Sequence, residues 1–132
     1  MDCNAFVKSF ECGEKSLAVS VTVGYNDREN DFEALILRRD AEALGISAGR
    51  PLTDDDIDGI RRADSVRDAF FRGMRLLSYG DNTKRKLEYK LKSRGIAADV
   101  AADAVSYLSD GGYIDERKQL EARASVLARR LP

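Results

Sequence analysis

The chain has 132 residues, of which 43% are hydrophobic and 34% are charged, and its formal net charge is −1. This length and composition suit one globular domain or two small ones, and they exclude a disordered polymer. No apolar run approaches the roughly 18–20 residues of a membrane-spanning helix, and the first residues lack the pattern of a signal peptide. We therefore expect a cytoplasmic protein in which Cys3 and Cys12 are reduced.

Charge is distributed unevenly along the chain. Residues 1–60 contain six basic and thirteen acidic side chains, which gives this segment a net charge of −7. Residues 61–94 contain eleven basic and four acidic side chains, which gives +7. A basic middle segment that follows an acidic front indicates an oriented partner, either an acidic protein surface or a nucleic-acid backbone.

The first part of the chain predicts a small β-sheet. Residues 17–25 alternate large apolar with small side chains at a period of two, which is the pattern of a strand with one buried face. Turns at residues 13–15 and 26–30 separate this strand from an earlier one and from a third strand near residues 32–37. The apolar face of three such strands needs a cover, for which we expect a short helix over residues 39–44.

A helix is predicted to open at the segment Pro51-Leu52-Thr53. Thr53 is a candidate N-cap, and the three aspartates at 54–56 lie in the first turn, where carboxylates offset the positive end of the helix dipole. The same aspartates, together with Asp58, raise the alternative of a metal site. Neighbouring helix positions point in different directions and no further ligands complete such a site, so no metal is expected.

Three further short helices are predicted, each of which depends on tertiary burial because it is too short to be stable alone. The first begins at Asp64 or Ser65, either of which can cap it, and ends near Tyr79. The second covers residues 83–94 and the third covers residues 98–110.

The helix over residues 83–94 has a predicted inner stripe. Thr83 suits its N-cap, because the hydroxyl can accept a hydrogen bond from a free amide of the first turn. Leu87 and Leu91 are four residues apart and therefore share one face. Gly95 suits the left-handed residue that commonly ends a helix.

A corner of glycine, tyrosine, isoleucine and aspartate follows the third helix. Gly112 is expected to adopt a backbone conformation closed to other residues, while Tyr113 and Ile114 pass apolar side chains into the core. Asp115 is expected to cap a last helix over residues 115–131, whose apolar stripe can fold back or find another subunit.

Residues 76–117 carry a pattern of leucines, glycines and one tyrosine corner. It consists of Leu76-Leu77-Ser78-Tyr79, Thr83 to Leu87 with Leu91, Arg94-Gly95-Ile96, Leu108, and Gly112-Tyr113-Ile114-Asp115-Glu116-Arg117. This pattern resembles the first helical repeat of the RecX family, whose members regulate the recombinase RecA. The corner together with correctly spaced flanking helices carries the resemblance, and the strand-rich front matches less specifically.

The resemblance implies an α+β fold in which a small N-terminal antiparallel sheet precedes a helical domain built on a RecX-type three-helix repeat. We expect residues 1–50 to form a β-rich subdomain with one short helix, and residues 51–132 to form the helical region. The first repeat would cover residues 64–112, and residues 115–131 would begin a second. Family members have further repeats, so we expect a shortened or excerpted member.

The resemblance also implies a function. It is that of a regulatory protein that binds RecA or the RecA–DNA filament and inhibits recombinase, ATPase and co-protease activities in DNA repair and the SOS response. Neither an enzymatic activity nor a cofactor is expected, because the chain has no histidine, no phosphate-binding glycine loop and no zinc-ligand array.

The candidate partner-binding residues lie on the helix that Leu87 and Leu91 anchor. A step of 100° per residue places Arg85, Tyr89 and Lys92 opposite the leucines, and a tyrosine among cations offers a rigid recognition surface. The alternative is an ordinary solvated helix face. The full candidate set is Arg85, Lys86, Tyr89, Lys90, Lys92 and Arg94, extended by Arg67, Arg72 and Arg75 on the preceding helix.

Two other functions stay open from the sequence. One is a DNA-binding module without sequence preference, in which the basic face contacts phosphates directly. A helix-turn-helix that reads bases is disfavoured, because the helix over residues 98–110 has three aspartates and no lysine or arginine. The other is a protein–protein assembly module.

Overall fold

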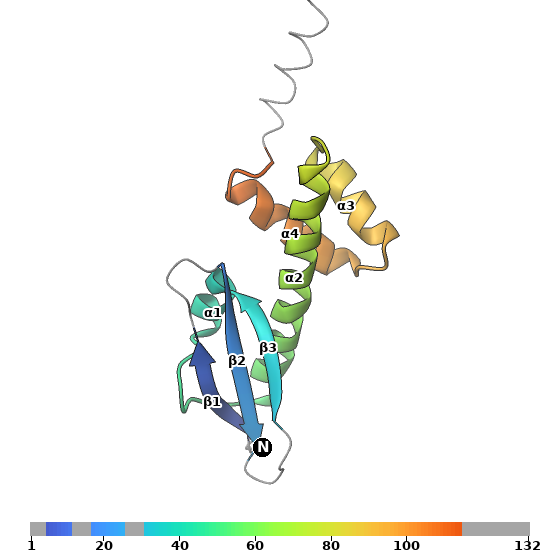
Figure 1. Cartoon of the computed structure of the whole chain (residues 1–132). Coiled ribbons are helices and arrows are strands. Elements are labelled where there is room, and N and C mark those ends of the chain that lie inside the picture. Colours follow the sequence, from blue (N-terminus) through green and yellow to red (C-terminus); the bar gives the residue numbers. More distant parts are fainter. Residues whose placement is uncertain (1–4, 12–16, 26–30, 115–132) are drawn as a thin grey trace, which may run out of the picture. The chain divides into compact units, whose positions relative to one another are not determined.

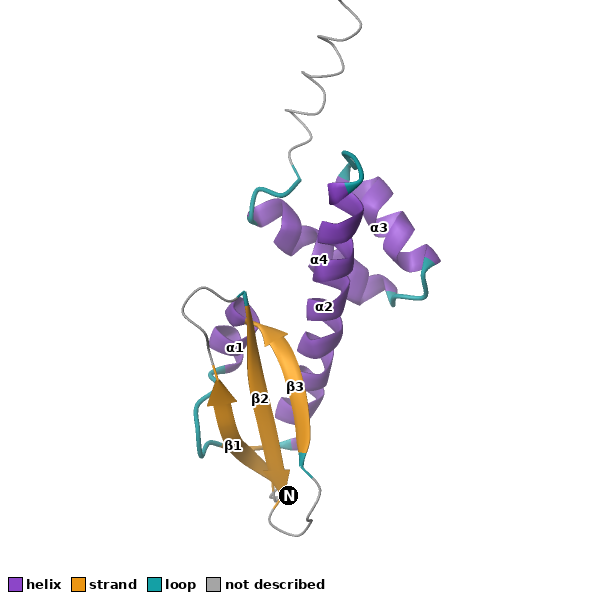
Figure 2. Cartoon of the chain, in the orientation of Figure 1, coloured by secondary structure: helices purple, strands orange, loops and turns teal. Residues whose placement is uncertain are grey.

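The computed structural model describes residues 5–11, 17–25 and 31–114 (Figure 1). The chain has the predicted α+β fold, in which a small antiparallel sheet precedes a run of helices (Figure 2). The predicted last helix, Asp115, Cys3 and Cys12 lie outside the described residues. In chain order the elements are β1 (Ala5–Glu11), β2 (Ala18–Tyr25), β3 (Phe32–Leu37), α1 (Arg38–Leu44), β4 (Pro51–Leu52), α2 (Asp54–Ser78), α3 (Lys84–Ser93) and α4 (Ala98–Asp110).

The chain divides into two compact units, Met1–Asp68 and Ala69–Pro132. The boundary falls inside α2, whereas the sequence predicts a division at residue 50, after the short helix that follows the predicted strands. The structural boundary lies later because Ile57, Ile60 and Ala63 of α2 belong to the hydrophobic core of the sheet.

The described sheet has four antiparallel strands in the order β3-β2-β1-β4. Three strands were expected, and the fourth is the two-residue β4, which pairs with Ala5 and Phe6 of β1. Pro51 and Leu52 thus belong to the sheet and do not open the helix. Because β4 has only two residues, an alternation with a period of two cannot be recognised in its sequence.

The core of the first unit lies on one face of the sheet. The predicted alternation in β2 is confirmed, since Val19, Val21 and Val23 are each no more than 1% exposed. Both α1 and the first half of α2 cover this face (Figure 1), and Ala41 and Ile60 pack there. Full burial of a valine or isoleucine side chain contributes about 1.5–3 kcal/mol, so this layer holds the unit together.

The start of α2 is fixed by a reciprocal pair of hydrogen bonds. The backbone N–H of Thr53 donates to Asp56 Oδ2 at 2.9 Å, and the backbone N–H of Asp56 donates to Thr53 Oγ1 at 3.2 Å. The first of these bonds is the main reason that the pKa of Asp56 lies below its ordinary value of 3.8, and the positive charge of Arg50 lowers it further. Thr53 is therefore the N-cap, as predicted, and Asp56 completes a capping box.

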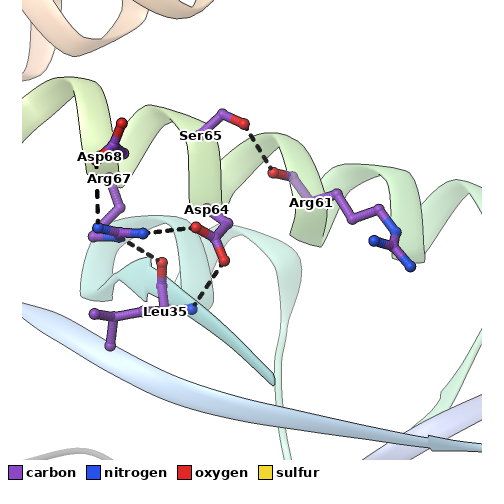
Figure 3. Close-up of polar contacts among 6 residues, drawn as sticks. All are labelled: Leu35, Arg61, Asp64, Ser65, Arg67 and Asp68. Atoms are coloured by element: carbon purple, nitrogen blue, oxygen red, sulfur yellow. Dashed lines mark hydrogen bonds and ion pairs between the residues drawn. The ribbon is translucent and has the colours of Figure 1, made fainter. Parts of the chain in front are cut away.

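One prediction about α2 is wrong. A separate helix was expected to begin at Asp64 or Ser65, but α2 is a single helix of 25 residues that passes through both. Cap-type residues can remain inside a helix when their side chains find other partners. The Ser65 hydroxyl donates to the carbonyl of Arg61, and the Asp64 carboxylate bonds to Arg67 and to the backbone of Leu35 (Figure 3).

The second unit is built around two leucines of α3 and one of α4. Leu87, Leu91 and Leu108 are 0% exposed. The last turns of α2 approach them closely at Gly73, where an added Cβ atom would lie 2.6 Å from Leu108 Cδ1. A glycine in the middle of a helix is unfavourable by itself, so this close approach explains why the position holds one.

The predicted corner after α4 closes this core. Gly112 has a φ of +81°, which favours glycine, and Ile114 is 5% exposed. The ring of Tyr113 meets Phe70 edge to face, with 5.9 Å between the ring centroids, while 43% of the tyrosine stays exposed. The corner therefore acts through packing, as the sequence indicated.

We predict that the stabilising effect of Asp56 depends on pH. Its pKa is lowered in the folded state, so its contribution is present above the ordinary pKa of 3.8 and is lost as the pH falls through the lowered value. Asp56→Ala should reduce the free energy of unfolding by about 1 kcal/mol at pH 7 and by clearly less at pH 2. Urea unfolding at both pH values measures this difference in the free energy of unfolding.

The control is Asp55→Ala, which removes an exposed carboxylate of the same turn. An equal loss for Asp56→Ala at both pH values would contradict the prediction.

We also predict that Gly73→Val destabilises the protein by about 1–3 kcal/mol, because the new side chain overlaps the fully buried Leu108. The substitution otherwise removes an unfavourable helix glycine, so intrinsic helix propensity predicts the opposite sign. Arg72→Val places the same side chain on the exposed neighbouring position and serves as the control. Thermal unfolding that shows Gly73→Val as stable as the parent would refute the close approach.

Candidate partner-binding surface

Helix α3 has the N-cap and the buried stripe that the sequence predicted. The hydroxyl of Thr83 accepts a hydrogen bond from the backbone N–H of Lys86 at 3.2 Å, which confirms Thr83 as the N-cap. Leu87 and Leu91 are its buried residues. Because the helix has 3.6 residues per turn, burial of these two leucines directs the opposite stripe to solvent.

The exposed stripe carries the predicted aromatic and basic side chains. Tyr89 is 71% exposed, and the neighbouring cations are exposed as well. We define the α3 face as the exposed residues Arg85, Lys86, Tyr89 and Lys92 of this helix together with Arg94, the exposed C-cap that follows it. Such a surface combines long-range attraction for anions with a rigid aromatic ring for contact.

The first turn of α3 has an unusual charge for a helix start. It contains Lys84, Arg85 and Lys86 and no acidic residue, whereas the first turn of α2 holds three aspartates and that of α4 holds Asp99. Cations at a helix N-terminus oppose the helix dipole, at a cost of about 0.3–1 kcal/mol each when exposed. Local helix stability therefore does not explain these cations.

Lys90 makes a structural hydrogen bond that the sequence did not predict. Its Nζ donates to Oδ1 of Asn82 at 2.7 Å, and Asn82 Nδ2 donates to the carbonyl of Gly80 at 3.2 Å. Asn82 is 3% exposed and is the one buried polar residue among those described. Lys90 thus connects α3 to the α2–α3 loop, eight residues back in sequence, and no short-range pattern indicates such a contact.

Lys92 remains available to a partner although it has an ion-pair contact. Its Nζ lies 3.9 Å from Glu88 Oε1, one helical turn earlier, and the two side chains are 45% and 34% exposed. Exposed pairs of this kind contribute about 0.3–0.5 kcal/mol on a helix. A partner carboxylate or phosphate can therefore replace Glu88 at little cost.

The three predicted arginines of α2 differ in their surroundings. Arg72 and Arg75 are exposed, as the prediction of an extended basic patch requires. Arg67 instead lies in the first unit, where it bonds to Asp64 and to the carbonyl of Leu35. Tyr79, directly after α2, is 79% exposed and is an aromatic side chain that the candidate set left out.

Other classes of site find no support in the described part of the chain. Its aspartate and glutamate side chains form no group of three or more that could hold a metal ion. None of its helices combines the length and the apolar composition needed to cross a lipid bilayer.

Comparisons with known proteins show what the chain is similar to. No protein-family model matches the chain. A protein named Regulatory protein RecX from Leuconostoc citreum is 25% identical over 73 residues, which is 55% of this chain and 27% of that protein. A protein of the same name from Leuconostoc mesenteroides is 26% identical over 93 residues, which is 70% of this chain and 35% of that protein.

A crystal structure of regulatory protein RecX has the same fold. It superposes with a TM-score of 0.71 at 17% sequence identity, over 96% of this chain and 60% of that chain. The resemblance to the RecX family is confirmed. The RecX-like chain spans about a third of the length of the curated relatives it matches, 27% and 35% respectively.

We predict that Asn82 supports this RecX-like helical unit. Asn82→Ala removes a hydrogen bond to a charged group and the bond to Gly80, so it should lower the free energy of unfolding by about 1.5–3 kcal/mol. Ser93→Ala is the control, since the Ser93 hydroxyl donates only to the carbonyl of Tyr89 at an exposed position. Urea unfolding of both variants measures this, and equal stabilities would show that the Lys90 contact is not structural.

Proposed function

We propose that the chain is a non-enzymatic regulatory protein that binds RecA, or the RecA–DNA filament, through the α3 face. In this proposal, binding inhibits the recombinase, ATPase and co-protease activities of the filament. Such a regulator acts in DNA repair and the SOS response. The proposal joins the similarity to proteins named Regulatory protein RecX with a surface suited to an anionic partner.

The observation that carries the proposal is the run of cations at the start of α3. Arg85 and Lys86 occupy the end of the helix where positive charge is least favourable. An acidic protein surface or a phosphate backbone compensates them, and the steering of such a partner requires clustered exposed charge. Tyr89 lies among these cations and provides apolar contact area once the partner has arrived.

Inhibition by this route requires no chemistry from the regulator. A filament that exchanges between active and inactive states shifts toward the state that binds the ligand better. To shift an equilibrium from 1:99 to 99:1, the regulator must bind the inactive state roughly 10⁴-fold more tightly than the active one. The rigid base of the α3 face, with Leu87 and Leu91 fully buried, supports such discrimination between two filament geometries.

A second candidate function is direct binding of DNA without sequence preference. Its support is the exposed pair of aromatic and basic side chains, Tyr89 and Arg85, because bases stack on aromatic rings while cations contact phosphates. This mode predicts a steep dependence of affinity on salt concentration. A protein–protein assembly module, in which the α3 face binds some other acidic protein, is a third candidate.

We predict that Arg85→Glu combined with Lys92→Glu weakens filament binding by about tenfold or more, since attraction becomes repulsion at two exposed positions. The measurement is a titration against RecA–single-stranded DNA filaments, RecA alone and DNA alone at two salt concentrations, with ATP hydrolysis followed in parallel. Helicity should be unchanged, because both side chains are exposed.

A matched control for this experiment is Arg39→Glu combined with Arg62→Glu. These arginines are exposed in the first unit, so the net charge changes equally while the α3 face stays intact. Tight binding to the filament alone, with slowed ATP hydrolysis, supports the RecA proposal. Binding to bare DNA that falls steeply with salt supports the second candidate instead, and unaltered binding of the α3-face variant excludes that face.

A further inference from the structure

Strand β3 lies at an edge of the described sheet, and side chains of α2 occupy the hydrogen-bonding groups of its middle residue. The backbone N–H of Leu35 donates to Asp64 Oδ2 at 3.3 Å. The carbonyl of Leu35 accepts from Arg67 Nε at 3.0 Å (Figure 3). Both backbone groups of Leu35 are therefore bonded to side chains at the edge, where an added strand would otherwise supply the partners.

The two side chains that bind Leu35 also hold each other in place. Arg67 Nη2 donates to Asp64 Oδ1 at 2.7 Å, and the pair is spaced by three residues on one face of α2. Asp64 thus presents an acceptor and Arg67 presents a donor, side by side, as one residue of a neighbouring strand would. We call these two residues the edge pair.

An unprotected β3 would be suited to pairing with another strand. It has the sequence Phe-Glu-Ala-Leu-Ile-Leu, with a single charged residue, Glu33. Leu35 is 42% exposed, and Leu17, the residue directly before β2, is 47% exposed. Apolar edge strands of this kind invite association between chains, which natural proteins prevent with charges or a cover.

The geometry of β3 favours a second copy of this chain as the added strand. Because the N–H and C=O of Leu35 bond on the same side, two β3 strands can form a two-fold antiparallel pair with Leu35 opposite Leu35. In that register Glu33 faces Leu37 of the other copy, so no like charges oppose each other.

We propose that the edge pair is a guard that keeps β3 of a second copy from adding to the sheet. This role is independent of the α3 face and of RecA. The edge pair competes with an incoming strand for the same two backbone groups of Leu35, and its removal leaves them open to a partner strand.

Replacement of the edge pair tests this guard role in the 132-residue chain. Asp64→Ala combined with Arg67→Ala should raise the self-association constant by about tenfold or more, because two competing hydrogen bonds are lost. Sedimentation equilibrium at several protein concentrations measures this constant. The control is Asp58→Ala combined with Arg62→Ala, which removes an exposed acid and an exposed base from the same half of α2.

A triple variant shows whether the new association uses β3. Addition of Leu35→Lys should return the double variant to the association constant of the parent, because a charge on an edge strand opposes pairing. Association that rises in the double variant and survives Leu35→Lys would overturn the proposal, as would no rise at all.

If circular dichroism shows the double variant to be unfolded, Arg67→Lys takes its place. It retains the charge but lacks the Nε donor, and an association constant equal to that of the parent would then overturn the proposal.

Discussion

Burial of Leu87 and Leu91 is the constraint on which the candidate surface depends. Helix α3 has only ten residues, so it cannot persist alone in water and relies on packing against its neighbours. The close approach at Gly73 and the buried Leu108 of α4 provide that packing. Once two positions four residues apart are fixed inward, the helix period fixes the outward positions too. The α3 face is therefore held in place by buried leucines that are not themselves part of the face.

The same chain uses its charged side chains in two different ways. In the first unit they bond to the backbone: Asp56 caps α2, and Asp64 with Arg67 covers the edge of β3. On α3, Arg85 and Lys86 are instead exposed in the first turn, where positive charge opposes the helix dipole. The basic segment of residues 61–94 therefore contains both kinds of charged side chain, since Asp64, Arg67 and Lys90 make structural hydrogen bonds there.

A regulator that acts by binding needs an ordered surface, and the second unit has one in the α3 face, which the buried Leu87 and Leu91 anchor. Its fold is the one seen in a RecX crystal structure, and its relatives carry the name of a regulatory protein. Lys90 illustrates how the surface is supported. Its ammonium group donates to the buried Asn82 and thereby positions α3 against the loop that precedes it.

The sequence by itself determined the features that depend on local rules. Periodicity identified β2 and the leucine stripe of α3, cap chemistry identified Thr53 and Thr83, and the tyrosine corner indicated the resemblance to the RecX family. Tertiary structure alone decided that α2 is one helix. From the sequence Asp64 is a plausible N-cap, but in the fold its carboxylate bonds to Arg67 and to the backbone of Leu35, which is 29 residues earlier. It likewise decided which cations are engaged within the chain, because Lys90 and Arg67 differ from Arg85 only in what lies near them in space. Hydrogen bonds between residues far apart in sequence depend on the packed chain, and no short-range pattern records them.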